Sequence, residues 1–225
     1  MERYSPSVLL VQESYPPSEH LPNVDNVWSN SIWAPAVKSE KKLNWGSGVF
    51  LSGSSPTQLT IPDFDGWVVG AEVSNWPQSP TNSSVTRFFS VHAPSGFGSY
   101  QTAVNRILDF LLEYRNACDL VIGGDFNLTV SKRHKDEKKT TSNADLKIQA
   151  RLRDEFGLIN CWQYANPDRP LSQTLRWVSD KDVPYHCDGI FVPKEWAESL
   201  ESCQVISGES WDGLSDHNPV VASFS

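Results

Sequence analysis

Short apolar runs separated by turn residues recur along the first half of the chain. They have the length and the β-branched and aromatic content of buried strands. One run ends directly at Gln12 and Glu13, and another leads straight into the segment GDFN at residues 124–127, so Glu13 and Asp125 are expected at strand ends. The pattern predicts strands at residues 8–11, 48–51, 67–73, 87–92 and 119–123.

Other segments have a different spacing. Residues 99–114 and 145–156 carry apolar side chains three and four positions apart, which predicts two helices, and Gly157 supplies a stop after the second. The Pro- and Asn-rich residues 15–31 predict a long surface loop. Four further strands are expected, at residues 174–178, 189–192, 203–206 and 220–224. Many short strands with few helices favour two packed sheets flanked by helices, a four-layer α/β sandwich, in one domain spanning residues 1–225.

Composition narrows the class of protein. The four cysteines are scattered without a CxxC pair and the chain opens without a signal-like segment, which favours reduced thiols in a cytoplasmic protein. No apolar run approaches the roughly 20 residues that cross a bilayer. The net charge of −8 argues against a generally basic nucleic-acid binder, although acidic residues around a bound cation create a site that attracts phosphate. The mostly basic residues 132–139 predict a solvated loop, with contact to a polyanionic substrate as the alternative.

Asp125 and Asn127 pair a carboxylate with an amide at a strand end. Two glycines before them let the backbone turn sharply and approach a ligand closely. Such a pair can orient a water, because the carboxylate accepts its proton while the amide fixes the geometry or contacts a metal. An Asx turn that closes a loop is the alternative for this motif taken alone.

A second motif with chemical potential is SDH at residues 215–217. Asp216 can ligate a hard cation, and His217 can hydrogen-bond a phosphoryl oxygen or handle a proton; a turn cap is the alternative. Asp188 comes immediately before a predicted strand and can hold the imidazole of His217 in one tautomer. For the nearby His186, a place at the surface is expected rather than a catalytic role.

The order of these motifs is more specific than any one of them. The chain runs through strand-QE, strand-HAPS, strand-GGDFN, CDGIFV and finally SDHNPV. This order resembles the endonuclease/exonuclease/phosphatase family, which includes deoxyribonuclease I, apurinic endonucleases, neutral sphingomyelinases and inositol polyphosphate 5-phosphatases. The resemblance extends from Val8 to Phe224, with further similarity at residues 45–49 and 156–162. It implies a deoxyribonuclease I-like α/β/β/α sandwich of two mostly antiparallel sheets.

The resemblance also implies a role for each matching residue. By motif, the metal ligands are Glu13 and Asp216, and the catalytic residues are His92, Asp125, Asn127, Asp188 and His217. His92 stands where deoxyribonuclease I-like and sphingomyelinase-like members have histidine and apurinic endonucleases have tyrosine, which argues against abasic-site repair. Relatives contact substrate in the segment that here contains Thr174, Arg176 and Trp177, with a place in the core as the alternative for Trp177.

The chain departs from the family pattern at its N-terminus. Members begin with a strand that carries an asparagine in a WN motif, followed by a helix, before the strand that ends in QE. Met1 lies only a few residues before Val8, so the resemblance implies an N-terminally shortened chain without that strand, helix and asparagine. A missing interior strand leaves backbone groups of a sheet unpaired. We therefore expect weakened activity, or strand sharing with a neighbouring copy.

Together these residues predict a phosphoesterase that depends on Mg²⁺ or Mn²⁺, since oxygen ligands suit these ions and the sequence has no Cys/His cluster with zinc spacing. In this reading Asp125 activates the attacking water, while His92 and His217 hydrogen-bond the phosphoryl oxygens or assist the leaving group. A nuclease acting on DNA or RNA is preferred. The alternatives are a phosphatase or phosphodiesterase acting on a lipid or inositol phosphate, and a catalytically silent binding module of the same fold.

Overall fold

A six-stranded sheet forms the centre of the molecule, in a computed structural model that describes residues 6–17, 30–176 and 184–225. The strand order is β4-β5-β6-β7-β9-β8. β6 and β7 run parallel, and every other neighbouring pair is antiparallel. The strands are β4 (Thr57–Leu59), β5 (Val68–Ser74), β6 (Val85–His92), β7 (Asp119–Asp125), β8 (Leu158–Asn160) and β9 (Asp188–Pro193).

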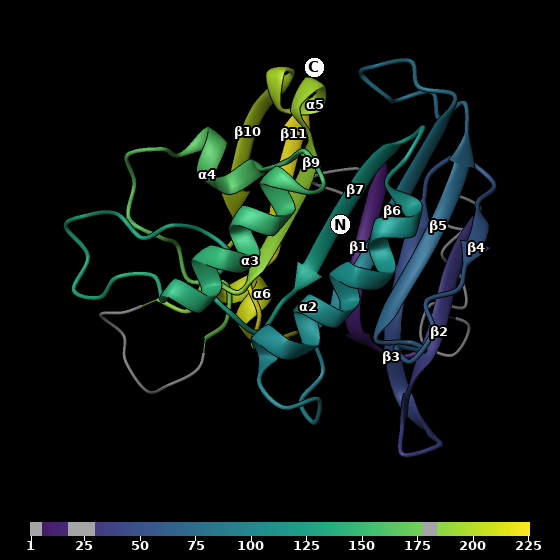
Figure 1. Ribbon diagram of the computed structural model, residues 1–225, viewed down its shortest axis with the longest axis horizontal. Coiled ribbons are helices and arrows are strands. Elements are labelled where there is room, and N and C mark those ends of the chain that lie inside the picture. The colour runs from purple at the N-terminus through teal and green to yellow at the C-terminus, as the bar shows by residue number, and fades with distance from the viewer. Residues whose placement is uncertain (1–5, 18–29, 177–183) are drawn as a thin grey trace.

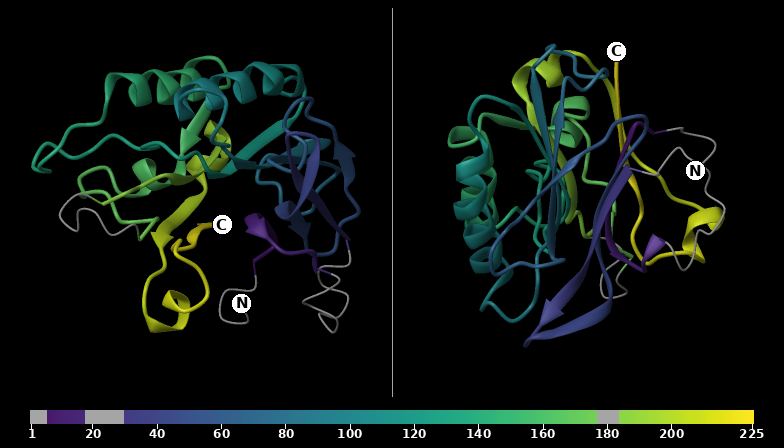
Figure 2. Two further views of the ribbon diagram at one scale, coloured as in Figure 1. Left: turned by 90° about the horizontal axis from the view of Figure 1, so that it is seen from below. Right: turned by 90° about the vertical axis from the view of Figure 1, so that its right-hand side faces the viewer.

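A second layer of strands packs against one face of this sheet (Figure 2). It contains a three-stranded sheet in the order β1-β3-β2 and a two-stranded sheet of β10 and β11. In the described part of the chain, β1 forms its ladder with β3, and β11 forms its ladder with β10. The layer is therefore two separate sheets. Its strands are β1 (Val8–Ser14), β2 (Asn30–Lys38), β3 (Lys41–Leu51), β10 (Leu200–Val205) and β11 (Val220–Phe224).

The other face of the six-stranded sheet is covered by the two longest helices (Figure 1), α2 (Tyr100–Leu111) and α3 (Asn143–Asp154). The hydroxyls of Ser99 and Ser142 cap these helices by accepting hydrogen bonds from backbone N–H groups of the first turn. The short helix α6 (Glu209–Asp212) lies on the far side of the second strand layer (Figure 2). The arrangement confirms the expected α/β sandwich.

Alternation along the strands divides the core into two clusters. Phe88 and Val121 point into the space between the strand layers, whereas the adjacent Phe89 and Ile122 point toward the helices. All four side chains are buried. Because both faces of β6 and β7 are covered, the ends of these two strands are held in a fixed position, and the candidate site lies at those ends.

Several elements differ from the prediction. Of the expected loop at residues 15–31, residues 18–29 lie outside the described ranges, and β2 begins at Asn30. The predicted strand at 48–51 is the end of the much longer β3. In the predicted strand at 174–178, Leu175 forms only isolated bridges, and residues 177–183 lie outside the described ranges. The sequence also did not predict β4, β8, η1 (Leu112–Tyr114) as a 3₁₀ turn, α4 (Cys161–Ala165), α5 (Lys194–Glu198) or α6.

Residues 132–139 form an irregular loop, as predicted, and within it Arg133 makes a buried ion pair with Glu137 at 2.8 Å. All four cysteines are unpaired. Within the described ranges, no helix combines the length and the apolar character needed to cross a bilayer.

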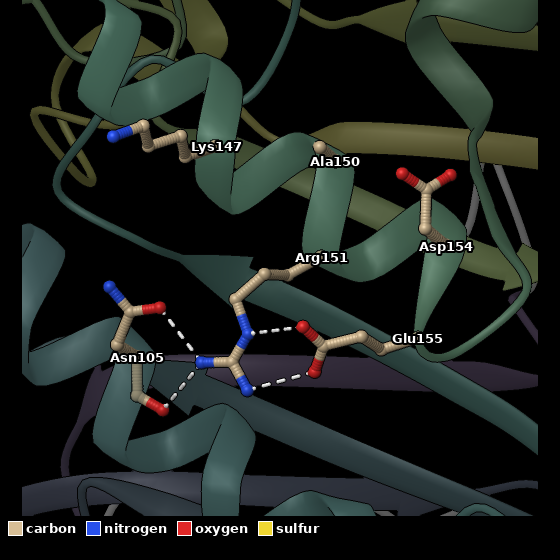
Figure 3. Close-up of a pocket in the computed structure, with 6 residues that line it drawn as sticks. All are labelled: Asn105, Lys147, Ala150, Arg151, Asp154 and Glu155. Carbon is tan, nitrogen blue, oxygen red and sulfur yellow. Dashed lines mark hydrogen bonds and ion pairs between the residues drawn. The ribbon is translucent and has the colours of Figure 1, made fainter.

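A hollow in the outer helical layer lies between α2 and α3 (Figure 3). Its centre is the guanidinium of Arg151, which donates to Asn105 Oδ1 at 2.8 Å and to the carboxylate of Glu155 at 3.0 Å. These polar groups satisfy one another. The hollow is part of the helical face and does not include the strand-end residues that carry the candidate chemistry.

Candidate active site

Three of the predicted catalytic residues lie side by side in one row across the six-stranded sheet. In the parallel pairing of β6 with β7, His92 is the register partner of Asp125. In the antiparallel pairing of β7 with β9, Asp125 is the register partner of Asp188. Cross-strand partners point to the same face of a sheet. Strand register therefore brings together residues that are 33 and 63 positions apart in the sequence.

The end of β7 is shaped around Asp125. Gly124 has a positive φ of 139°, and a Cβ at this position would lie 2.0 Å from the carbonyl oxygen of Val91, so only glycine fits. Asn127 has a left-handed backbone, and its N–H donates to Asp125 Oδ1 at 2.8 Å. The Asn127 side-chain amide donates to the carbonyl of Ala93 at 3.1 Å. The Asx turn considered from sequence is thus present, and it orients the Asp125 carboxylate.

The environment of Asp125 adapts it to proton transfer. Its pKa is raised to about 7, first by burial and then by the negative charge of Asp188. The charge of His217 and hydrogen bonds from Asn127 and Cys187 offset part of this increase. A carboxyl group that titrates near neutral pH suits the role of a general base.

His217 is held by Asp188. Nδ1 of His217 lies 3.1 and 3.0 Å from the two carboxylate oxygens of Asp188. Burial alone would lower the pKa of His217, but the hydrogen bond and charge of Asp188, together with the charges of Asp125 and Asp216, raise it to about 9. The imidazole therefore carries its second proton at neutral pH. Since Nδ1–H is taken by Asp188, Nε2–H is the group that can donate to a phosphoryl oxygen.

Thr174 and Arg176 are the two described residues of the predicted substrate segment. Both hydrogen-bond to the backbone that carries the site residues. Thr174 is fully buried, and its hydroxyl accepts hydrogen bonds from the backbone N–H groups of Cys187 and Asp188 at 3.0 and 3.1 Å. We therefore revise its expected role from substrate contact to positioning of Asp188. Arg176 donates its backbone N–H to the carbonyl of Asp216 at 2.8 Å and its guanidinium to Asn218, which anchors the loop that carries His217. Trp177 lies outside the described residues.

His92 occupies an aromatic wall of the site. Its ring contacts Trp45 and Trp67 at centroid distances of 5.7 and 5.1 Å, and its Nε2 lies 3.9 Å from Asp125 Oδ2. Burial, followed by the charge of His217, lowers the pKa of His92 to about 4, and the charge of Asp188 opposes this shift. His92 is therefore neutral at pH 7, in contrast to His217.

Glu13 reaches the site from the second strand layer. The ladder between β1 and β3 shifts register between Val11 and Ser14, and Glu13 in this bulge has a φ of 50°. Bulges commonly redirect a side chain. The pKa of Glu13 is raised by burial, lowered by the charge of His217 and raised by Asp216 and Asp188, so the glutamate lies within electrostatic reach of all three.

A hydrogen-bond bridge connects the two strand layers beside Glu13. Gln12 Nε2 donates to Ser90 Oγ at 2.8 Å, and Ser90 Oγ donates to the carbonyl of Val11 at 2.8 Å. Ser90 is fully buried in β6, two residues before His92. Ser90 was not among the residues selected from the sequence, although a hydroxyl between Phe89 and Val91 is a detectable signal.

The carboxylates of Glu13 and Asp216 fit a hard divalent cation. Mg²⁺ keeps several waters and is commonly held by one or two carboxylates together with substrate phosphate oxygens. Burial raises the pKa of Glu13, and the negative charge of Asp216 raises it further, so Asp216 lies within electrostatic reach of Glu13. Among the described residues, a second set of possible metal ligands lies close together and differs from this pair. It is formed by Cys187, Asp188 and His217.

His186 is buried, although a surface position was expected from the sequence. It is 1% exposed rather than at the surface, its Nδ1 lies 2.7 Å from the carbonyl oxygen of Ser172, and its ring contacts Trp162. The reason is its position two residues before β9, next to the buried Cys187.

No family model matches the chain, and no curated protein matches it in sequence. Solved structures match it over nearly its whole length. An AP endonuclease from Archaeoglobus fulgidus has a TM-score of 0.71 and 16% identity, covering 99% of this chain and 90% of its own. The 3′-5′ exonuclease NExo from Neisseria meningitidis has a TM-score of 0.66 and 20% identity, with coverages of 97% and 89%. AP endonuclease LMAP from Leishmania major has a TM-score of 0.64 and 14% identity, with coverages of 98% and 78%. The chain therefore has the AP endonuclease fold, which is the deoxyribonuclease I-like sandwich expected from its motifs.

Proposed function

We propose that this protein is a Mg²⁺- or Mn²⁺-dependent phosphodiesterase, and that its substrate is DNA or RNA. The observation that carries the proposal is the row of Asp125 and Asp188, with His217 hydrogen-bonded to Asp188. It places a carboxyl group of pKa about 7 beside an imidazole of pKa about 9. A base and a cationic hydrogen-bond donor are thus both in their active protonation states at slightly alkaline pH.

Each described residue of the site has its own role in the proposed reaction. Asp125, fixed by the Asn127 backbone, accepts the proton of the attacking water. His217 donates Nε2–H to a phosphoryl oxygen, where negative charge develops. His92 is neutral and borders the same space, so it can donate or accept a hydrogen bond without adding charge. Glu13 and Asp216 would hold a divalent ion, which would neutralise part of the phosphate charge when bound.

The solved structures of the same fold support a nucleic acid as substrate. They include AP endonucleases, a 3′-5′ exonuclease and a 3′ phosphatase bound to a product DNA hairpin. Bound cation at Glu13 and Asp216 would offset part of the negative charge of this chain at the point where the phosphate enters.

The test is a substrate panel in Mg²⁺: plasmid DNA, duplex DNA with an abasic site, an RNA oligonucleotide, an inositol phosphate and a chromogenic phosphodiester. Wild-type protein is compared with Asp125→Asn and with Asp63→Asn, a control at an exposed carboxylate that pairs with Arg106. We expect cleavage of nucleic acid, a loss of at least about 100-fold in Asp125→Asn, and wild-type rates in Asp63→Asn.

Each other outcome has a definite meaning. Turnover of only the inositol phosphate would replace the nuclease by a small-substrate phosphatase. A wild-type protein that binds DNA and cleaves none of the five substrates would indicate a binding module. Equal turnover by wild type and Asp125→Asn would remove Asp125 from the mechanism.

A further inference from the structure

A mixed group of metal donors, with a soft sulfur, a borderline nitrogen and a hard oxygen, lies within the candidate active site. Cys187 Sγ, a carboxylate oxygen of Asp188 and a ring nitrogen of His217 all lie within 4.8 Å of one another. Cys187 and His217 are 30 positions apart, so this grouping has no sequence spacing that would reveal it. The donor types differ from those of the Glu13 and Asp216 pair, which offers oxygen atoms alone. Thiolate and imidazole ligands favour zinc over magnesium.

Two of the three donor separations within this group are close to those of a tetrahedral site. With Zn–S near 2.3 Å and Zn–N and Zn–O near 2.0–2.1 Å, tetrahedral geometry separates the donor atoms by about 3.3–3.5 Å. Cys187 Sγ lies 3.5 Å from Asp188 Oδ2, and His217 Nδ1 lies 3.0 Å from the same oxygen. These two separations differ from the tetrahedral values by a few tenths of an ångström, and the third, between Cys187 Sγ and the His217 ring nitrogen, lies within 4.8 Å.

The group is held in place before any ion arrives. The backbone N–H groups of Cys187 and Asp188 both donate to Thr174 Oγ1, and the carbonyl of Cys187 accepts from the N–H of Phe126 at 3.0 Å. His217 is fixed by a backbone bridge to Leu175. Cys187 is buried, whereas the side chains of Asp188 and His217 are 13% and 22% exposed, so an ion can approach from the His217 side.

We propose that Cys187, Asp188 and His217 form a Zn²⁺ site whose occupation inhibits the enzyme; the inhibition, though not the binding, rests on the proposed function. Zn–S and Zn–N bonds replace the S–H bond of Cys187 and the Nδ1–H bond of His217. Two protons leave for the solvent as one Zn²⁺ enters, so the net charge of the group is unchanged. Water or the carboxylate of Asp125, which also contacts the thiol, takes the fourth position. The ion then separates His217 from Asp188, and the catalytic pair is lost.

Binding is tested without any activity measurement. Co²⁺ is titrated into metal-free protein, because a tetrahedral thiolate site gives a ligand-to-metal charge-transfer band and intense d–d bands, and Zn²⁺ should then displace the Co²⁺. We compare the wild type with Cys187→Ser and with Cys118→Ser, a half-buried thiol beside Arg87 on the far end of the molecule's central sheet. The thiolate band should appear in wild type and Cys118→Ser and be absent in Cys187→Ser, with affinity for Zn²⁺ falling at least about 100-fold.

The wild-type protein alone can overturn the site, so the test does not depend on folding of Cys187→Ser. Co²⁺ binding without a thiolate band, or a band equally strong in Cys187→Ala, contradicts it. For inhibition, cleavage is measured in excess Mg²⁺ with increasing Zn²⁺, and each protein is normalised to its own uninhibited rate. Zn²⁺ should inhibit wild type and Cys118→Ser at lower concentration than Cys187→Ser. A thiolate band in a protein without turnover would sink the proposed function but leave the site. Turnover that Zn²⁺ inhibits equally in all three proteins would contradict the Zn²⁺ site and leave the proposed function standing.

Discussion

Asp125 and Asp188 are direct cross-strand partners of β7 and β9, so two carboxyl groups face the same side of the sheet at one end of the site. Two nearby carboxylates repel each other when both are charged. The imidazolium of His217 offsets this repulsion on the Asp188 side, where Nδ1 lies 3.0 Å from Oδ2. Asp125 is buried and has no such cationic partner at hydrogen-bond distance in the described chain. The consequence is an unequal pair, in which Asp125 is the carboxyl group that holds its proton near neutral pH.

Asp125 should therefore destabilise the metal-free protein at alkaline pH. Its pKa in the folded state, about 7, exceeds the ordinary value of 3.8, so its stabilising contribution is complete below pH 3.8 and lost as pH rises through about 7. In chelator, Asp125→Asn should be more stable than wild type at pH 8 by about 2–4 kcal/mol, and the difference should shrink toward pH 5. Urea unfolding at several pH values measures this. A variant less stable than wild type at pH 8 would contradict the assignment.

Asp188 should control the charge of His217. Asp188→Asn removes the hydrogen bond and the negative charge that outweigh burial, so the pKa of His217 should fall from about 9. Turnover should decrease by about 100-fold or more, since the imidazole is then uncharged at neutral pH. NMR titration of the imidazole signals measures the first effect, with the signals of His134 as a reference outside the site. An unchanged titration of His217 in Asp188→Asn would show that Asp188 does not hold it.

Asp119, at the opposite end of β7, should contribute to stability and not to turnover. Its Oδ2 accepts hydrogen bonds from Ser79 Oγ at 2.8 Å, from Trp196 Nε1 at 2.9 Å and from Thr81. Asp119→Ala leaves these donors buried without an acceptor, which should lower stability by about 2–3 kcal/mol. Turnover measured well below the melting temperature should equal that of wild type. Loss of turnover in a variant that is still folded would mean that this end of β7 communicates with the site.

The contrast between these two aspartates shows what the sequence could predict. The sequence placed Asp125 correctly, because a covered strand followed by two glycines has a recognisable pattern. It also located α2 and α3 within a few residues, since their apolar spacing is regular. It did not locate β2, where Pro35 interrupts the alternation and the ladder with β3 shifts register beyond it. A strand of this kind is held by its neighbour rather than by its own pattern.

At the site, the sequence failed to predict some contacts for a different reason. Cys187 reads as an ordinary core residue in the sequence, and its closeness to His217 arises from the pairing of β7 with β9 and from the bridge between Leu175 and His217. Thr174 was interpreted as a substrate contact, but register places its hydroxyl under the backbone of Asp188. Motif order identified which residues matter. Only the strand register shows which of them touch each other and which lie beneath the site.

The candidate site draws residues from both small sheets of the second strand layer. β1 and β11 belong to separate sheets, yet apolar residues of both pack on the same cluster between the layers, among them Leu10 and Phe224. Each strand uses one side for its ladder with β3 or β10 in the described chain. Glu13 lies on β1, and His217 lies three residues before β11, so the packing of both strands on this shared cluster sets where these two residues stand relative to each other.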